Sequence, residues 1–287
     1  MHRIRLTDTT PGGDRSFPAG YDSGVVSQPA RNGVDVVTSA RQGLHAKLDS
    51  GRMLLGGHRG NADEFPENTM ASFRSAIDLG VDVIECDVHL TADHQLAVIH
   101  DHLLDRTTNG HGLVRDLTMA EIKQLDAGSW KAPQFRGERV PTLTEVLDLA
   151  RGRVGVAIEI KNLPLAYPGI EQAVLEATQA AGMLSDVIVI AFDHRCLRRL
   201  RELSPAILTG ALEASRPVDI LGLLADAGAE VFCPHWSAIE PETARELHAA
   251  GKLIGVWTVD DPIALAWTQA LPANAVYTNK PRTIRPT

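Results

Sequence analysis

Short apolar runs alternate with segments of helical periodicity along most of the chain. Eight runs rich in β-branched and other apolar residues predict strands at Met53–Gly57, Val81–Val88, Arg153–Ile160, Val187–Ala191, Ala206–Gly210, Val231–Pro234, Leu253–Val259 and Ala275–Thr278. Segments between them predict helices at Asn68–Leu79, Thr142–Ala150, Gly169–Ala180, His194–Leu203, Pro217–Ala227, Pro241–Ala249 and Pro262–Gln269. Such an alternation predicts an α/β fold, a closed (β/α)8 barrel of the TIM type.

Proline marks the expected start of the last three helices. Pro217, Pro241 and Pro262 each stand where a first helical turn tolerates the missing N–H. Their expected capping neighbours are Ser215, Glu240 and Asp260 or Asp261.

One segment departs from the alternation. The run from Gln95 to His100 follows the second strand after a polar turn that is too short for a parallel crossover. The two runs therefore predict an antiparallel hairpin, and a turn centred near Asp93 sets His100 roughly opposite Cys86. His100 should then lie close to the two acidic residues that flank Cys86.

The N-terminal part lacks this regularity. Glycine and proline recur from Pro11 to Gly33 at a density that prevents long regular elements. We expect residues 1–51 to form an irregular extension, with a short helix near Thr38–Leu48 that covers the bottom of the barrel. Residues 52–287 should form the barrel domain, a length typical of this fold.

Composition narrows the choice of partners and compartment. The net charge of −8 gives no basic surface for DNA or RNA. No run of about 18 apolar residues predicts a membrane span, and Met1–Gly20 lacks the apolar region of a signal peptide. Three widely spaced cysteines without a CxxC pair indicate reduced thiols. We expect a cytoplasmic protein that binds no nucleic acid and has no transmembrane segment.

Acidic residues at two strand ends suggest a metal site. Glu85 and Asp87 are two positions apart, so both side chains point into the barrel, where unpaired carboxylates are strongly unfavourable. Glu159 and Lys161 repeat this spacing on another strand. If Glu159 faces the same interior, three oxygen ligands converge, which suits Mg²⁺ or Ca²⁺ better than zinc, and Lys161 adds a positive charge beside them. Taken alone, the first pair is also consistent with a solvated strand end, and the second with a charge pair within one strand.

Imidazoles and a guanidinium also fall at strand ends. His58 and Arg59 lie between glycines after the first strand, where Arg59 can hold a phosphate and His58 can move a proton near neutral pH. His100 is the second candidate proton carrier. Two imidazoles beside cations meet the needs of phosphodiester cleavage, although a lone His-Arg pair is commonly a surface feature. Trp257 suggests an aromatic wall for glycerol or an alcohol, or else a core residue, and His235 is a further candidate for the barrel mouth.

Several motifs, in this order and spacing, resemble those of the glycerophosphodiester phosphodiesterase family. They are GHRG at 57–60, PENT at 66–69, ECDVHLTAD at 85–93, VIHD at 98–101, LDRTTNGHG at 104–112 and IEIK at 158–161. The resemblance extends from about Met53 to Pro281. It departs from the family pattern at Asn279, where Asp is common, and the extension at 1–51 has no recognised family counterpart.

The resemblance implies an enzyme that hydrolyses glycerophosphodiesters to glycerol 3-phosphate and an alcohol. By position it implies that one divalent cation, Ca²⁺ or Mg²⁺, is held by Glu85, Asp87 and Glu159. It implies further that His58 and His100 are the acid/base pair and that Arg59 and Lys161 contact phosphate. It also implies an insertion at about 103–141 that caps the mouth and shapes the alcohol pocket.

Three other functions stay open from the sequence. One is a phospholipase D-like lyase or hydrolase acting on lysophospholipids, for which a stable cyclic phosphate product would be the mark of the lyase. Another is a different barrel chemistry with Lys161 as a Schiff-base lysine beside Glu159, which leaves the imidazoles without a role. The third is a catalytically silent protein that binds phosphoesters. The order of the two histidines as acid and base is also left open.

Overall fold

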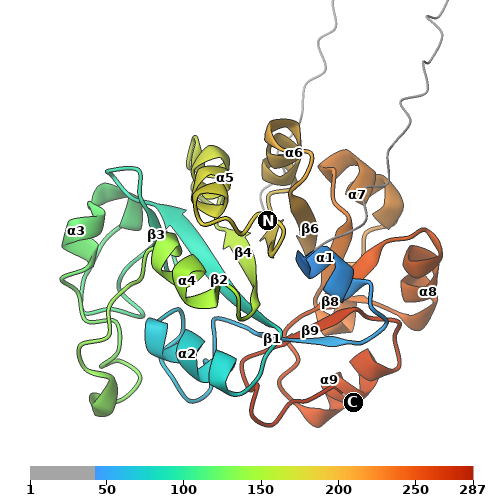
Figure 1. Cartoon of the computed structure of the whole chain (residues 1–287), viewed down its shortest axis with the longest axis horizontal. Coiled ribbons are helices and arrows are strands. Elements are labelled where there is room, and N and C mark those ends of the chain that lie inside the picture. The colour runs from blue at the N-terminus through green and yellow to red at the C-terminus, as the bar shows by residue number, and fades with distance from the viewer. Residues whose placement is uncertain (1–42, 287) are drawn as a thin grey trace, which may run out of the picture. The chain divides into compact units, whose positions relative to one another are not determined.

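The computed structural model describes residues 43–286. Eight parallel strands form a closed barrel (Figure 1): β1 Leu54–Gly57, β2 Val83–Leu90, β4 Gly155–Ile160, β5 Val187–Ala191, β6 Leu208–Glu213, β7 Val231–Pro234, β8 Leu253–Val256 and β9 Ala275–Thr278. Strand β1 pairs with both β9 and β2, which closes the barrel. The predicted (β/α)8 fold is therefore confirmed.

Helices surround the strands in the expected order (Figure 1). The α-helices are α1 Gly43–Leu48, α2 Met70–Asp78, α3 Met119–Ile122, α4 Leu143–Ala150, α5 Ile170–Ala180, α6 His194–Leu203, α7 Ile220–Ala227, α8 Pro241–Ala249 and α9 Pro262–Gln269. Three short 3-10 helices are η1 Val114–Asp116, η2 Pro133–Phe135 and η3 Trp236–Ala238. Within residues 43–286, no helix has both the length and the apolar character that crossing a membrane requires.

The prediction that Pro217 opens a helix is wrong. Helix α7 begins at Ile220, and the side chain of Asp219 caps it by accepting a hydrogen bond from the Gly222 backbone N–H at 2.8 Å. Pro217 lies in the loop before this cap. The other two positions agree with the prediction, since Pro241 and Pro262 both stand in the first turns of their helices.

The predicted hairpin is present and has the expected register. Strand β3, Leu96–Val98, pairs antiparallel with β2, and Val88 lies opposite Val98. The Ile99 backbone N–H then donates to the Asp87 carbonyl at 3.0 Å. Continued by one position, this register sets His100 beside Cys86 as predicted, although β3 ends two residues before His100.

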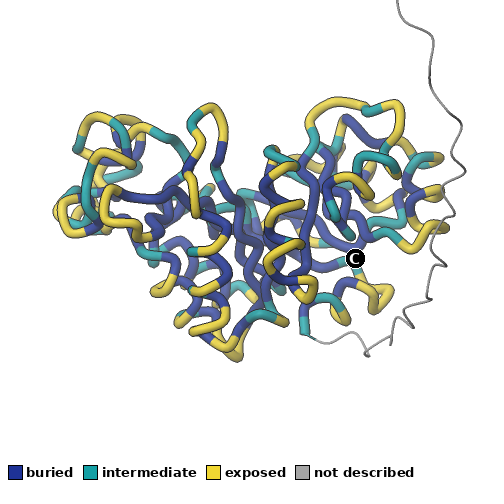
Figure 2. Tube along the Cα trace, turned by 90° about the horizontal axis from the view of Figure 1, so that it is seen from above, coloured by how far each residue is buried: buried dark blue, intermediate teal, exposed yellow. Residues whose placement is uncertain are grey.

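The strands separate two apolar regions, one between the strands and the helices and one inside the barrel. Cys86 and Val88 of β2 face outward into the apolar layer beneath the helices, whereas Val83 on the same strand faces inward. At the amino-terminal end of the barrel, Leu44 and Leu48 of α1 pack with the inward side chains and close the bottom. The predicted helix therefore covers the bottom at 43–48, and its residues 38–42 lie outside the described part. Figure 2 shows buried residues gathered in the central strands, with exposed residues on the surrounding helices and loops.

Residues 103–141 form a small subdomain beside the hairpin. Six buried side chains of this segment, among them Leu104, Val114, Met119 and Ile122, belong to an apolar cluster separate from the barrel core. The cluster joins the barrel through Ala97 and Ile99, on and just after β3. The segment therefore packs on the β2–β3 side of the barrel.

Candidate active site

Three carboxylates from two strands meet at the carboxyl end of the barrel. Glu85 and Asp87 extend from β2 and Glu159 from β4, and the register sets Asp87 and Glu159 side by side. One carboxylate oxygen of each lies within 4.8 Å of the other two, and all three residues are buried. The structure thus brings together the three side chains that the sequence suggested as ligands.

Two cationic side chains neutralise part of this charge. The Lys161 Nζ lies 2.6 Å from Glu159 Oε1 and 3.1 Å from Asp87 Oδ1. The Arg59 backbone N–H donates to Glu85 Oε2 at 2.8 Å, and the Arg59 Nε lies 3.4 Å from Asp87 Oδ2. Because Lys161 and Arg59 offset its burial, the pKa of Asp87 is held well below its usual range.

The donor set fits a hard divalent cation. Burial, followed by the charges of Asp87 and Glu159, raises the pKa of Glu85 well above its usual value, and burial raises the pKa of Glu159 to about 7. Glu85 Oε1 is buried and makes no hydrogen bond to the described residues. A bound cation would stabilise the ionised carboxylates and satisfy this oxygen, and ligands that are all oxygen suit Mg²⁺ or Ca²⁺.

A tight turn after β1 aims His58 and Arg59 at the carboxylates. Arg59 has a φ of 55°, and the following Gly60 has a φ of 87°. A Cβ on Gly60 would lie 2.3 Å from Ser72 Oγ, so only glycine fits there. This conformation points the Arg59 N–H at Glu85 and leaves the His58 Nε2 3.9 Å from Glu85 Oε2.

His58 is held by a neutral partner. Its Nδ1 lies 2.8 Å from Asn279 Oδ1, while Asn279 Nδ2 donates to Asp260 Oδ2 at 2.6 Å. Because a carboxylate only accepts hydrogen bonds, the bond to Asp260 fixes the amide oxygen of Asn279 toward His58. Burial, and next the charge of Arg59, lowers the pKa of His58 to about 4.

His100 is held by an anionic partner. Its Nδ1 lies 2.6 Å from Asp101 Oδ1, and Arg106 Nε donates to Asp101 Oδ2 at 2.6 Å. Arg106 also donates to both oxygens of Glu67, which in turn binds Arg59 at 2.9 Å. A continuous chain of charged contacts therefore links His100 to Arg59 through a residue of the 103–141 segment.

His89 is a further residue of the site that the sequence analysis did not single out. It lies on β2 and is 1% exposed. Its Nε2 lies 3.0 Å from the His100 carbonyl oxygen and its Nδ1 lies 2.9 Å from the Tyr167 hydroxyl. His89 is two positions after Asp87 and four after Glu85, so its side chain is expected on the same face of the strand, and this spacing could have identified it.

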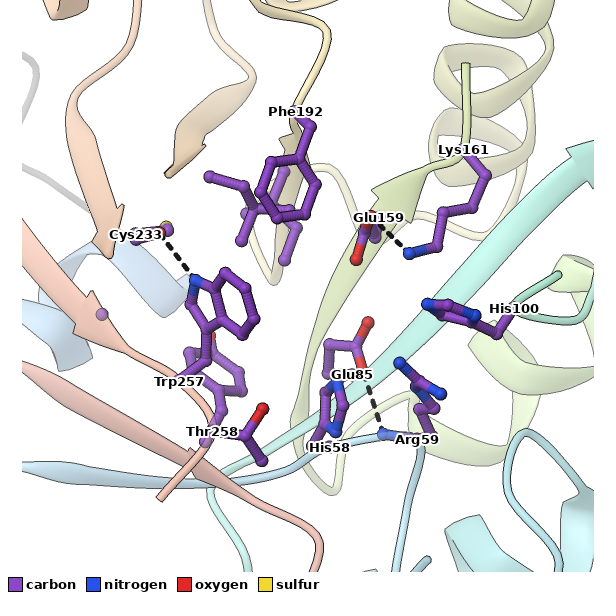
Figure 3. Close-up of a pocket in the computed structure, with 14 residues that line it drawn as sticks. His58, Arg59, Glu85, His100, Glu159, Lys161, Phe192, Cys233, Trp257 and Thr258 are labelled. Carbon is purple, nitrogen blue, oxygen red and sulfur yellow. Dashed lines mark hydrogen bonds and ion pairs between the residues drawn. The ribbon is translucent and has the colours of Figure 1, made fainter. Parts of the chain in front are cut away.

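The pocket above the carboxylates has one charged and one uncharged side (Figure 3). The charged side is lined by His58, Arg59, Glu85, His100, Glu159 and Lys161. The opposite side is lined by Ile190, Phe192, Leu212, Cys233, Gly255, Trp257, Thr258 and Tyr277. Trp257 Nε1 donates to the Cys233 carbonyl at 2.7 Å, and its ring meets Phe192 edge-on at 5.6 Å. Trp257 is thus part of the wall, as expected.

Two candidates for this pocket are not among the residues that line it. Within the described part of the chain, none of residues 103–141 lines it, because that segment packs on its own core beside β3. His235 does not line it either, since its ring packs against Trp257 from outside the pocket, at 5.4 Å. The 103–141 segment reaches the site through Arg106 alone among the contacts described above.

Fold and site together define a (β/α)8-barrel protein with a buried acidic cluster and two imidazoles at the carboxyl ends of its strands. The sequence profile of the glycerophosphoryl diester phosphodiesterase family matches residues 58–283. The chain belongs to this family, which confirms the resemblance.

Individual relatives are similar over most of their length. A glycerophosphodiester phosphodiesterase of Caldanaerobacter subterraneus is 37% identical, over 81% of this chain and 96% of that protein. A crystal structure of a glycerophosphodiester phosphodiesterase from Agrobacterium tumefaciens matches with a TM-score of 0.71 and 30% identity, over 80% of this chain and 98% of that one. An Oleispira antarctica phosphodiesterase in complex with the product sn-glycerol-3-phosphate matches with a TM-score of 0.74 and 28% identity, over 83% of this chain and 97% of that one.

Proposed function

We propose that this protein hydrolyses glycerophosphodiesters to glycerol 3-phosphate and an alcohol. Glu85, Asp87 and Glu159 hold one divalent cation, Mg²⁺ or Ca²⁺, and His58 and His100 transfer protons. Arg59 and Lys161 contact the phosphate, and Trp257 packs against the organic part of the substrate. The convergence of three buried carboxylates beside two imidazoles in one pocket is the observation that carries this proposal.

The charges of the site complement a phosphodiester. Three carboxylates with Arg59 and Lys161 leave one net negative charge, and a divalent cation would change this to one positive charge. A diester carries one negative charge, so substrate and site would then balance. When bound, the cation supplies Lewis-acid polarisation of a phosphoryl oxygen. Arg59 offers its guanidinium and Lys161 its ammonium to the oxygens on which charge develops.

The hydrogen-bond partners of the two imidazoles support different proton roles for them. Since Asn279 presents its amide oxygen, Nδ1 of His58 carries the hydrogen, and the neutral ring keeps a lone pair on Nε2, facing the site. His58 is therefore the general base, toward either water or the glycerol 2-hydroxyl. Burial lowers the pKa of His100, while the charge of Asp87 and the bond from Nδ1 to the Asp101 carboxylate act to raise it. Because only His100 has such an anionic partner for its protonated form, it is the general acid toward the leaving alcohol.

The neighbours of Lys161 favour a charged ammonium over a Schiff-base nucleophile. Burial acts to lower the pKa of Lys161, but Asp87 and Glu159 together raise it above its usual value. An amine that forms a Schiff base needs a lowered pKa. This arrangement supports a phosphate contact for Lys161.

Release of glycerol 3-phosphate from glycerophosphodiesters, with Mg²⁺ or Ca²⁺ and then with a chelator, tests the proposal. We expect turnover that the chelator abolishes, and a loss of about 10²-fold or more in His58→Ala and His100→Ala. His248→Ala, which removes an exposed imidazole on α8, is the matched control and should keep full activity. Normal turnover in His100→Ala would refute its role.

Product analysis separates the remaining functions. Phosphorus NMR that finds a stable cyclic phosphate would indicate a lyase, and binding of diesters without any cleavage would indicate a silent phosphoester-binding protein. Substrates that lack the glycerol 2-hydroxyl distinguish the attacking group. Undiminished turnover of these substrates would exclude attack by the internal hydroxyl.

A further inference from the structure

A second cavity adjoins the active-site pocket at the carboxyl ends of β4 and β5. It is lined by residues 159–163, by Phe192 and by Asp193, and we call it the β4–β5 trough. Glu159, Lys161 and Phe192 line both the trough and the pocket. The two spaces are therefore neighbours that share a wall, so a substrate chain that passes Phe192 from the carboxylates would reach the trough.

The polar groups of the trough already have partners within the protein. Asn162 Nδ2 donates to Asp193 Oδ2 at 2.7 Å, and Asn162 Oδ1 accepts from the Tyr167 backbone N–H at 2.7 Å. The Asp193 carboxylate also accepts from the Arg195 backbone N–H at 3.2 Å. Lys161 is bound to Glu159. A hydrophilic ligand group would have to compete for these bonds.

Two apolar side chains of the trough, in contrast, are open to solvent. Leu163 is 59% exposed and Phe192 is 39% exposed, although both are large apolar residues. Both line the trough, from the segments that follow β4 and β5. In Figure 3, Phe192 lies at the edge of the pocket, beyond Trp257 and Glu159. Covering these side chains with an apolar ligand would be favourable.

We propose that the β4–β5 trough binds an alkyl or acyl chain of the substrate, with Leu163 and Phe192 as the residues that determine this specificity. The inference rests on the proposed phosphodiesterase function. Such a chain has two chemical sources, an apolar alcohol on the phosphate or an acyl ester on the glycerol. Both present the same methylene groups to the trough.

Two substrate series distinguish the sources. The first joins glycerol 3-phosphate to ethanol, butanol, hexanol or octanol, and the second joins an acetyl, butanoyl, hexanoyl or octanoyl group to the glycerol of the ethyl diester. Full burial of a methylene group is worth about fourfold in affinity. Because the trough is open on one side, we expect kcat/KM to rise about twofold per methylene group in one of the two series.

Substitutions in the trough test whether the alkyl or acyl chain of the substrate binds there. Leu163→Ser should at least halve the logarithmic slope of kcat/KM against chain length, while hydrolysis of the ethyl diester stays within about twofold of the wild type. Phe192→Ser should also reduce the slope, and it provides the same measurement if Leu163→Ser does not fold. Leu203→Ser is the matched control, because Leu203 is 50% exposed on α6 and lines neither cavity.

The outcomes separate the two proposals. Hydrolysis of the ethyl diester with no chain-length dependence in either series would overturn the trough and leave the phosphodiesterase function standing. A dependence that persists unchanged in both folded variants would also overturn it, because the chain would then lie elsewhere. If no diester is hydrolysed in Mg²⁺ or Ca²⁺, the proposed function fails and the inference fails with it.

Discussion

The two walls of the pocket come from different halves of the barrel. The charged side chains that line it come from β2, β4 and the segments that follow β1, β3 and β4, whereas β5 to β9 and their loops contribute uncharged side chains. On the charged wall, each functional group is fixed by hydrogen bonds or ion pairs, as in the chain from His100 to Arg59. On the uncharged wall, Trp257 and Phe192 are fixed by packing and one hydrogen bond.

The charged wall should therefore govern the chemical step, and the uncharged wall the substrate specificity. Small displacements on the charged wall move groups that must align within a fraction of an ångström, so substitutions there should lower kcat. The uncharged wall contacts the organic part of the substrate in ground state and transition state alike, so substitutions there should raise KM. A charged-wall variant that changes mainly KM, or an uncharged-wall variant that changes mainly kcat, would contradict this division.

The largest expected effect is that of Glu85→Gln on the charged wall. A divalent cation contributes several kcal/mol to the transition state, so losing one ligand should lower kcat/KM about 10³-fold. Gln keeps an oxygen for the Arg59 N–H, so the turn after β1 should be unchanged. Glu242→Gln, an exposed acid on α8, is the matched control for steady-state kinetics. Turnover within tenfold of the wild type in Glu85→Gln would show that this carboxylate holds no essential cation.

The same variant has the opposite effect on stability in chelator. Because the folded-state pKa values of Glu85 and Glu159 are raised, ionising these carboxylates opposes folding and acts to lower the stability of the metal-free protein as the pH rises from about 5 through about 7. His58 and His89, whose folded-state pKa values are lowered to about 4, act in the opposite direction in wild type and variant alike. Glu85→Gln removes one carboxylate only, so its unfolding free energy in urea should rise relative to that of the wild type as the pH rises. A constant or falling difference between the two would contradict the raised pKa of Glu85.

Asp101→Asn tests the partner of His100. An amide cannot stabilise the imidazolium as a carboxylate does, so kcat should fall by about 10-fold to 100-fold with a smaller change in KM. Asp105→Asn is a close control, because Asp105 also binds a histidine, His111, at 2.9 Å but away from the pocket. Equal kinetics for Asp101→Asn and Asp105→Asn would remove Asp101 from the proton transfer.

Local patterns predicted most of the fold. Strands β5, β7 and β9 have the predicted bounds, since each is a compact apolar run between turn residues. The prediction for β6 ended too early, at Gly210, because glycine usually interrupts a strand. Gly210 instead lies inside β6, where a Cβ would be 2.8 Å from Cys233 Sγ, so neighbouring side chains require the small residue. That requirement is a packing relation between strands and has no local signal.

The residues of the charged wall could be predicted from the sequence better than those of the uncharged wall. Residues of the charged wall lie in short motifs near strand ends, so the sequence could suggest the three carboxylates and both imidazoles. Asn279 was seen as a departure from the family pattern, but its role as the partner of His58 depends on a contact across 221 positions. Phe192 was missed altogether, because nothing around it distinguishes a pocket aromatic from a core aromatic. Only the closed barrel brings it to Trp257.

On the uncharged wall, Trp257→Phe should give a smaller effect of the other kind. The change removes the bond from Nε1 to the Cys233 carbonyl and part of the ring that faces the pocket. We expect KM to rise about fivefold to tenfold and kcat to change less than about threefold. Trp267→Phe is the matched control, since its Nε1 also donates to a carbonyl, that of Ile239 at 3.2 Å, outside the pocket. A fall in kcat with constant KM would place Trp257 among the reaction groups.

The smallest effect on turnover is expected from Tyr167→Phe, which tests the support behind the charged wall. The His100 carbonyl only accepts, so His89 donates to it from Nε2, and its Nδ1 must accept from the Tyr167 hydroxyl. Without that hydroxyl a buried acceptor loses its donor, which should cost about 1 to 3 kcal/mol of unfolding free energy in urea. The bond from His89 to His100 remains, so kcat should stay within about twofold. A larger fall in kcat would mean that the loop between β4 and α5, which contains Tyr167, helps His89 to hold His100 in place. The charged wall would then depend on the loop that also contributes Leu163 to the trough.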